Sequence, residues 1–171
     1  MAKNKIERTK AKAEAKAKAK SSQDEVLLRN KKAHHDYEIL KTYECGLVLQ
    51  GSEVKSLREK NVQWADAHGE IERGEAWLLG LHVEVYKQAS WSNHNPRSKR
   101  KLLLHRNEID HIAGALATKG CTMVPLQIHL SNGRIKILMA LAKGKAKGDK
   151  RRDLLTREKN RDIERAMGRR E

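Results

Sequence analysis

The sequence predicts a mainly β protein, in which four or five antiparallel strands and one core helix form a small closed or partly open barrel. Three observations favour this class. Apolar residues alternate in several segments, turns rich in Gly, Asn and charged residues separate them, and one segment has helical spacing. With 171 residues, 38% of them hydrophobic, the chain has room for one domain with a modest core. Four or five antiparallel strands with one core helix favour a small barrel over a parallel sheet.

Basic residues are concentrated at the two ends of the chain. The 37 Lys and Arg residues exceed the 22 Asp and Glu residues, which gives a formal charge of +15. Residues 1–20 contain eight basic and two acidic residues, and residues 143–171 contain twelve and six, so each end carries +6. Two basic arms around a nearly balanced centre are suited to binding nucleic acid or an anionic membrane surface.

Residues 1–29 are dominated by lysine and alanine, and then by polar residues, without an apolar stripe. This composition predicts a basic arm that is disordered or only transiently helical. Because no apolar stretch follows the positive start, it is not a secretory signal, and we expect a cytoplasmic protein. No run of about 18 apolar residues is present to span a bilayer. We expect Cys45 and Cys121 to be buried small hydrophobic residues rather than reactive thiols.

Alternating apolar residues predict a long strand over residues 37–49, with Lys41 as the one break in the series. The Gly51-Ser52 pair ends this strand. We expect Ser52 to cap a short helix that ends near Asn61.

A turn at residues 72–75 then joins a polar strand at residues 67–71 to an alternating strand at residues 77–85. The odd-numbered apolar residues of the second strand, from Trp77 to Val85, are expected to face the core. Residues 89–101 are polar, contain one proline and four basic residues, and lack periodicity, which predicts a loop.

The best helix signal follows this loop. Ile109, Ile112, Ala113 and Leu116 recur at helical spacing, and Gly120 is expected to end the helix in a left-handed conformation.

Residues 122–130 and 134–141 then alternate around Asn132-Gly133, a pair that tolerates the positive φ angles of a tight hairpin turn. Because Pro125 has no N–H to donate, its strand is expected to lie at an edge or to be bulged there.

No motif indicates catalysis, a metal or a cofactor. The eight histidines show neither an HExxH pair nor zinc-finger spacing with cysteine, and no glycine-rich phosphate loop or GxSxG motif is present. No spacing singles out a pair among the acidic residues. We therefore expect a protein that is not an enzyme.

Further basic residues flank the predicted elements: Lys31 and Lys32, four residues within 97–101, and Lys143, Lys145 and Lys147. Each run alone could be a solvated surface segment, but folding could also bring the runs together. With three Trp, three Tyr and no Phe, the chain offers few platforms for stacking a long single strand, and only Trp91 lies in a polar loop. Recognition of structured RNA by shape and phosphate fits better.

The segment from Asp149 onward has a sparse apolar stripe and oppositely charged residues at helical spacing. Two interpretations are open. It is either a permanently disordered basic tail or a helix that forms only when an anionic partner supplies the missing contacts.

Four strings occur in order along the chain: NKKAHHDY from Asn30, YECGLVLQGSEVKSLRE from Tyr43, PRSKRKLLLHRNEI from Pro96, and LAKGKAKGDKR from Leu141. Together they resemble the SmpB family of SsrA-binding proteins, the protein partners of tmRNA in bacterial trans-translation. The resemblance implies an OB-like antiparallel β-barrel with two to three helices and a basic C-terminal tail. It divides the chain into an arm (1–29), a barrel (30–142) and a tail (143–171) that is helical on the ribosome.

The resemblance implies a tmRNA-binding adaptor. Such a protein binds the tRNA-like part of tmRNA, supports its aminoacylation and delivery with elongation factor Tu, and places its tail in the empty decoding centre and mRNA path of a stalled 70S ribosome. No membrane is involved. The alternatives are a general OB-type RNA chaperone or ribosome-assembly factor and, from another class, an enzyme that modifies or cleaves RNA.

The resemblance also implies the RNA-binding residues, position by position: Asn30, Lys32, His35, Glu44, Lys101, Leu103, His105, Lys143 and Lys145. Lys and His can donate to phosphate and 2′-OH, and Glu can accept from a base amino group or hold a basic side chain. Leu103 could instead pack in the core, and Glu44 could be an ordinary exposed strand residue.

Asp149, Lys150 and Arg151 match the tail motif that, by the same resemblance, contacts the decoding centre. The chain departs from the family pattern at two positions. Gly148 stands where His or Tyr is frequent, and His68 stands where Tyr is common. Both departures concern the decoding contacts and not the tmRNA-binding motifs.

Overall fold

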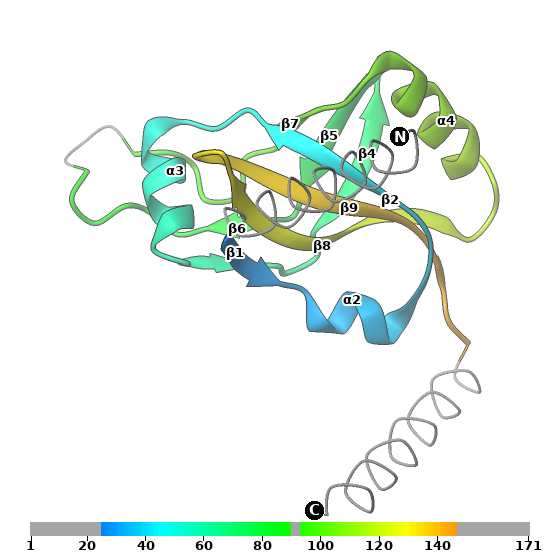
Figure 1. Ribbon diagram of the computed structural model, residues 1–171, viewed down its shortest axis with the longest axis horizontal. Coiled ribbons are helices and arrows are strands. Elements are labelled where there is room, and N and C mark those ends of the chain that lie inside the picture. Colours follow the sequence, from blue (N-terminus) through cyan, green and yellow to red (C-terminus); the bar gives the residue numbers. More distant parts are fainter. Residues whose placement is uncertain (1–24, 90–92, 147–171) are drawn as a thin grey trace, which may run out of the picture.

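The structure, a computed structural model, describes residues 25–89 and 93–146 (Figure 1). In chain order, the elements of these residues are β1 (Glu25–Arg29), α2 (Lys31–Asp36), β2 (Tyr37–Leu47), α3 (Gly51–Arg58), β3 (Val62–Gln63), β4 (His68–Glu72), β5 (Glu75–Leu79), β6 (His82–Val83), β7 (Arg100–Leu103), α4 (Arg106–Leu116), β8 (Cys121–Ser131) and β9 (Arg134–Gly144). No helix within the described ranges is long and apolar enough to cross a membrane.

Six strands form a closed ring of antiparallel pairings. Their order is β8-β4-β5-β7-β2-β9, and β9 pairs with β8 again, which closes the ring. β8 pairs with β4 at Met123 and with β1 nearer its other end, so β1 extends the sheet outside the ring. The predicted class, a mainly antiparallel β fold with helices, is confirmed, and the ring is compatible with an OB-like barrel.

The core has two parts. The larger part lies inside the ring and includes Leu78, Ile112, Met123 and Ile137, all fully buried. The smaller part lies on the outside of β8 and β9, beneath α2, and consists of Ala33, Val124, Leu126, Ala140 and Ala142. Burial on both faces of these two strands fixes α2 to the outside of the ring.

The predicted long strand is confirmed as β2, although it ends at Leu47 rather than Leu49. The break expected at Lys41 is a change in pairing register with β9 between Ile39 and Lys41. Leu40, which lies at this irregularity, is 52% exposed. This bulge switches the face of the odd-numbered residues, so the single buried face expected from the alternation is wrong: Tyr37 and Ile39 pack against the outer part of the core, and Tyr43 and Cys45 lie in the inner part.

The predicted C-terminal hairpin is confirmed as β8 and β9. Asn132 (φ 50°) and Gly133 (φ 74°) form its turn, with the positive φ angles of a type I′ turn. Of the two alternatives for Pro125, the bulge is correct, because the register with β9 shifts between Pro125 and Gln127. β8 is not an edge strand, since it has partners on both sides.

The single strand predicted over residues 77–85 is wrong. Gly80 interrupts it with φ +72°, and an added Cβ there would lie 2.5 Å from the Asp66 carbonyl oxygen. β6 beyond the break pairs with β3 in a separate two-stranded sheet. The break changes which side chains point inward: Ala76 and Leu78 are buried in β5, instead of the predicted Trp77 and Leu79.

Both helices differ from the predictions at their ends. The residue before α3 is Gln50 rather than Ser52, and its N–H donates to Glu53 Oε2 at 2.8 Å. α3 ends at Arg58, before Asn61. α4 is confirmed, but it ends at Leu116, so Gly120 (φ +87°) belongs to the following turn and does not terminate the helix.

Three predicted boundaries also need correction. The expected disorder of residues 1–29 is wrong for residues 25–29, which form β1 and bury Leu27. The predicted loop 89–101 is wrong at its last two positions, which belong to β7. β9 continues to Gly144, two residues into the predicted tail. Residues 1–24 and 147–171 lie outside the described residues.

Candidate nucleic-acid interface

Asn30, Lys32 and His35 are positioned by α2 and the residue before it. Asn30 holds the start of the helix: its Oδ1 accepts from Ala33 N at 3.1 Å, and its Nδ2 donates to Pro125 O at 2.9 Å. Lys32 is exposed on the helix. His35 Nδ1 lies 3.0 Å from Asp36 Oδ1. In this arrangement Asn30 orients the helix, and Lys32 is open to an anion.

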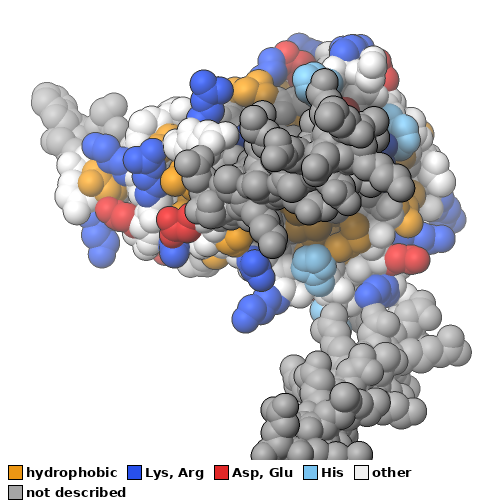
Figure 2. All heavy atoms as spheres, viewed as in Figure 1, with side chains coloured by type: hydrophobic (Ala, Val, Ile, Leu, Met, Phe, Trp, Pro, Cys, Tyr) orange, Lys and Arg blue, Asp and Glu red, His pale blue; other side chains and the backbone are white. Residues whose placement is uncertain are grey.

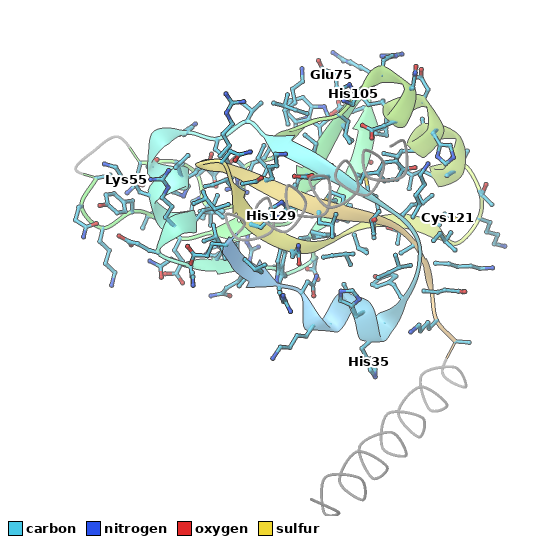
Figure 3. The ribbon with its side chains drawn as sticks, viewed as in Figure 1. His35, Lys55, Glu75, His105, Cys121 and His129 are labelled. Carbon is cyan, nitrogen blue, oxygen red and sulfur yellow. The ribbon has the colours of Figure 1, made fainter. Side chains whose placement is uncertain are left out.

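Lys143 and Lys145 reach the same end of the molecule from the other end of the chain. Glu38 of β2 is the register partner of Lys143 of β9, whose side chain is exposed. Lys145 N donates to Asp36 O at 3.0 Å, and Lys145 Nζ donates to His34 O at 3.4 Å. The fold therefore brings Lys145 to α2, whose residue His35 is labelled in Figure 3, while the Lys143 side chain lies toward Gly120 on the other face of β9.

Lys101, Leu103 and His105 form a second group along β7 and the start of α4. Lys101 forms an ion pair with Glu75 of the neighbouring strand β5. Leu103 is 53% exposed, which rules out the alternative that it packs in the core. His105 is the residue before α4, and its N–H donates to Glu108 Oε2 at 3.0 Å.

Glu44 lies on the outer face of β2 and is held by two neighbours. Lys136 Nζ is 2.7 Å from its Oε1, and His129 Nε2 is 3.3 Å from the same oxygen. The hydrogen bond from Lys136 and that from His129 hold the pKa of Glu44 below its usual 4.5, against the opposing effect of partial burial. Both contacts use Oε1, which leaves Oε2 without a partner among the described residues. Glu44 is thus a carboxylate that Lys136 and His129 hold in place, on a side chain that is 46% exposed.

Sequence reasoning missed that Arg100 is buried. Its predicted place was an exposed basic loop, but the side chain is 1% exposed and its Nε lies 2.8 Å from Glu53 Oε1. Arg100 also donates to the carbonyl oxygens of Leu81, Ser98 and Pro96. The only sequence signal was alternation: in β7, residues 100 and 102 point inward and residues 101 and 103 point outward.

Sequence reasoning also missed the exposure of Trp77, because it predicted that this side chain faces the core. Its ring is half-buried on β5, with Lys99 Nζ 4.9 Å from the ring centroid. Lys99 also pairs with Glu72 at 2.7 Å. The predicted stacking residue, Trp91, lies outside the described residues.

On the face in view in Figure 2, basic side chains do not gather into one patch. Figure 2 shows Lys and Arg side chains along the edge of the face in view, including the end that carries α3, with a few Asp and Glu side chains between them. Within residues 25–89 and 93–146, no three His, Cys, Asp or Glu side chains are grouped to hold a metal ion. The predicted tail residues Asp149, Lys150 and Arg151 lie outside these ranges. The arrangement offers cations and fixed hydrogen-bonding groups to a large anionic partner.

The sequence profile of the SmpB protein family matches residues 27–169. The chain belongs to the SmpB family. An SsrA-binding protein of Corynebacterium jeikeium is 51% identical over 145 residues, which cover 85% of this chain and 79% of that protein. An SsrA-binding protein of Nocardioides sp. is 53% identical over 145 residues, which cover 85% of this chain and 91% of that protein.

A solved structure of an SmpB-family chain supports the same assignment. It is described as "tmRNA-SmpB: a journey to the center of the bacterial ribosome", and its chain is 45% identical to this one. The superposition has a TM-score of 0.61 and covers 70% of this chain and 85% of that chain. Family membership therefore rests on both sequence and fold.

Proposed function

We propose that this protein is a tmRNA-binding adaptor for trans-translation, with no catalytic step of its own. The observation that carries the proposal is the contact of Lys145 with α2, because it joins a residue of the last family motif to the helix that carries the first. The names of the SsrA-binding relatives and the tmRNA–SmpB structure support the same partner. The excess of positive charge supports an RNA ligand.

In this proposal, Lys32, Lys143 and Lys145 contact phosphates of the tRNA-like part of tmRNA. Asn30 and His35 maintain the shape of that site, and the second group on β7 and α4, with Glu44, contacts a neighbouring stretch of the RNA. Contacts of this kind recognise a folded RNA by its shape, its phosphates and its 2′-hydroxyls. The pairing of Lys101 with Glu75 keeps that lysine in place without RNA.

We extend the proposal to the complex that acts in the cytoplasm. The adaptor would travel with tmRNA and elongation factor Tu to a stalled 70S ribosome. Asp149, Lys150 and Arg151 would then lie in the empty decoding centre, with the rest of the tail in the mRNA path. The basic character of the last segment supports contact with ribosomal RNA.

Binding of the full-length protein to tmRNA, bulk tRNA and an unrelated structured RNA tests the proposal. We expect strong preference for tmRNA, and about tenfold or greater weakening in a Lys32→Gln/Lys143→Gln variant. Lys55→Gln is the matched control, because Lys55 lies on α3, far from His35 in Figure 3, and contacts the Tyr86 ring. Similar affinity for all three RNAs would favour the general RNA chaperone instead.

The salt dependence of the same binding reaction tests its electrostatic part. If roughly five or more phosphates are neutralised, affinity for tmRNA falls by orders of magnitude between low and moderate salt. The Lys32→Gln/Lys143→Gln variant is expected to show a shallower slope, by about two counterions. A flat response in the unmodified protein contradicts phosphate-driven binding.

A further inference from the structure

A cavity of about 580 Å³ lies between α2, residues 64–68 and β8. Its walls include Lys31 and Lys32 from α2, Trp64 and Asp66 from the connection between β3 and β4, and Val124 from β8. Tyr37, the first residue of β2, also lines it. The cavity therefore combines aromatic and aliphatic walls with charges of both signs.

Trp64 brings an unused donor to this place. Its side chain packs against the interior core, and its Nε1 is buried with no hydrogen-bond partner among the described residues. Indole N–H groups that are buried usually have an acceptor, because a buried donor without one is costly. An acceptor supplied by a bound ligand would remove that cost.

The segment that carries Trp64 is held in a strained shape. Ala65 has φ 38°, a left-handed conformation that is unfavourable for a residue with a Cβ. Ala67 N donates to Trp64 O at 2.7 Å, and the close approach of Gly80 to the Asp66 carbonyl fixes the segment from behind. Such strain persists only where the surroundings impose it, and it is frequent at ligand sites.

The charges in the cavity walls suit a nucleotide. Lys31 and Lys32 form no ion pair within the described residues, so both ammonium groups can take a phosphate. Asp66 is exposed and can accept from ring N–H and amino groups on the edge of a base. The Trp64 and Tyr37 rings offer apolar surface to the flat base.

We propose that this cavity receives one unstacked base of the bound RNA, most favourably guanine, with a flanking phosphate at Lys31 and Lys32 and the N1–H and N2 amino edge toward Asp66. Guanine fits best because it presents both donors to one carboxylate. This inference rests on the proposed function, since it gives the α2 site a pocket for one nucleotide of the same RNA. A free guanine nucleotide has the same chemistry and is the competing source.

Ultraviolet crosslinking of the full-length protein to tmRNA, followed by mass spectrometry of the peptides, locates the base. The expected result is a nucleotide adduct, mainly guanosine, on the peptide that contains Trp64 or on the one that contains Tyr37. If tmRNA binds tightly and adducts form only on other peptides, the base pocket is refuted and the adaptor role stands. If tmRNA binds no better than bulk tRNA, the adaptor role itself fails.

Affinity measurements on variants provide a second test of the base pocket. We expect Trp64→Leu and Asp66→Asn each to weaken tmRNA binding by about fivefold or more. Trp64→Phe should retain stacking and fall between Trp64→Leu and the unmodified protein. Trp64→Leu also alters core packing and could prevent folding. Asp66→Asn changes an exposed side chain, so it tests the pocket even if Trp64→Leu does not fold. Glu59→Gln, at an exposed residue at the end of α3, is the matched control and should bind normally. Unchanged affinity in Asp66→Asn overturns the assigned base edge.

Competition with GMP separates the two sources of guanine. For an RNA base, GMP should compete with tmRNA only at millimolar concentration, and Asp66→Asn should abolish this weak competition. Micromolar binding of GMP that leaves tmRNA affinity unchanged would show a site for the free nucleotide and overturn the RNA assignment.

Discussion

At the residue scale, the two cysteines lie in different surroundings. Cys45 is completely buried, and burial raises the pKa of its thiol to about 12. Cys121 is half-buried at the start of β8, so the sequence-based expectation that both are buried is correct for Cys45 alone. Only a thiolate is an effective nucleophile toward alkylating reagents.

We therefore expect iodoacetamide to label Cys121 at pH 8 while Cys45 stays unmodified until the protein unfolds. Mass spectrometry of tryptic peptides, with and without denaturant, measures both rates. Labelling of Cys45 at the rate of Cys121 in native protein would show that the interior of the ring opens readily.

Glu44 gives a pH-dependent contribution to stability. Lys136 lowers its folded-state pKa below 4.5, so the contribution is present above the unfolded pKa and is lost as pH falls through the folded value. Because the side chain is 46% exposed, we expect Glu44→Gln to cost less than about 1 kcal/mol at pH 7. Urea unfolding at pH 7 and near pH 3 should show this difference disappear in acid. Glu70→Gln, at an exposed position of β4, is the control for replacing a strand carboxylate by an amide.

At the element scale, β1 shows why the predicted boundary at residue 29 is too late. Val26 and Leu28 pair with β8, and Leu27 is 7% exposed. We expect a protein lacking residues 1–29 to unfold at a lower temperature than one lacking residues 1–24, because it loses this pairing and the Leu27 contacts. Thermal unfolding followed by circular dichroism compares them directly. Equal melting temperatures would mean that β1 adds nothing to stability.

The buried pair of Glu53 and Arg100 joins α3 to β7 and the preceding loop. Replacing one partner leaves a buried charge without compensation, so we expect Glu53→Gln to destabilise the fold by about 3 kcal/mol. Glu72→Gln, which breaks the exposed pair with Lys99, is the matched control and should cost under about 1 kcal/mol. Chemical denaturation measures both; equal small losses would show that Arg100 is satisfied by its carbonyl partners alone.

At the scale of the whole molecule, the proposed function assigns the two steps to different parts of the chain. The residues proposed to bind tmRNA lie within 30–145, and the proposed decoding contacts begin at Asp149. Removing residues 149–171 should therefore spare tmRNA binding and abolish peptide tagging of a nonstop reporter. A gel shift and the tagging assay on the same protein measure the two steps. Loss of tmRNA binding by the truncated protein would place the tail in the primary RNA site.

The sequence by itself determined the features that depend on local patterns. Alternation located β2 and the β8–β9 hairpin, Asn132-Gly133 specified its turn, and the irregularities at Lys41 and Pro125 marked the bulges. These succeed because side-chain period and turn geometry are properties of a few consecutive residues. The family motifs identified the SmpB family because each of them is also a run of consecutive residues.

Only the tertiary structure decided which residues of the same type are buried and which face solvent. Arg100 and Lys101 are neighbours in one basic run, but strand pairing turns Arg100 inward to Glu53 and leaves Lys101 outside. Gly80 reversed the predicted facing of β5, because its φ is set by the approach of a distant carbonyl. The contact of Lys145 with α2 likewise depends on the long-range pairing of β2 with β9. Contacts between residues far apart in the chain leave no trace in local periodicity, so only the folded molecule reveals them.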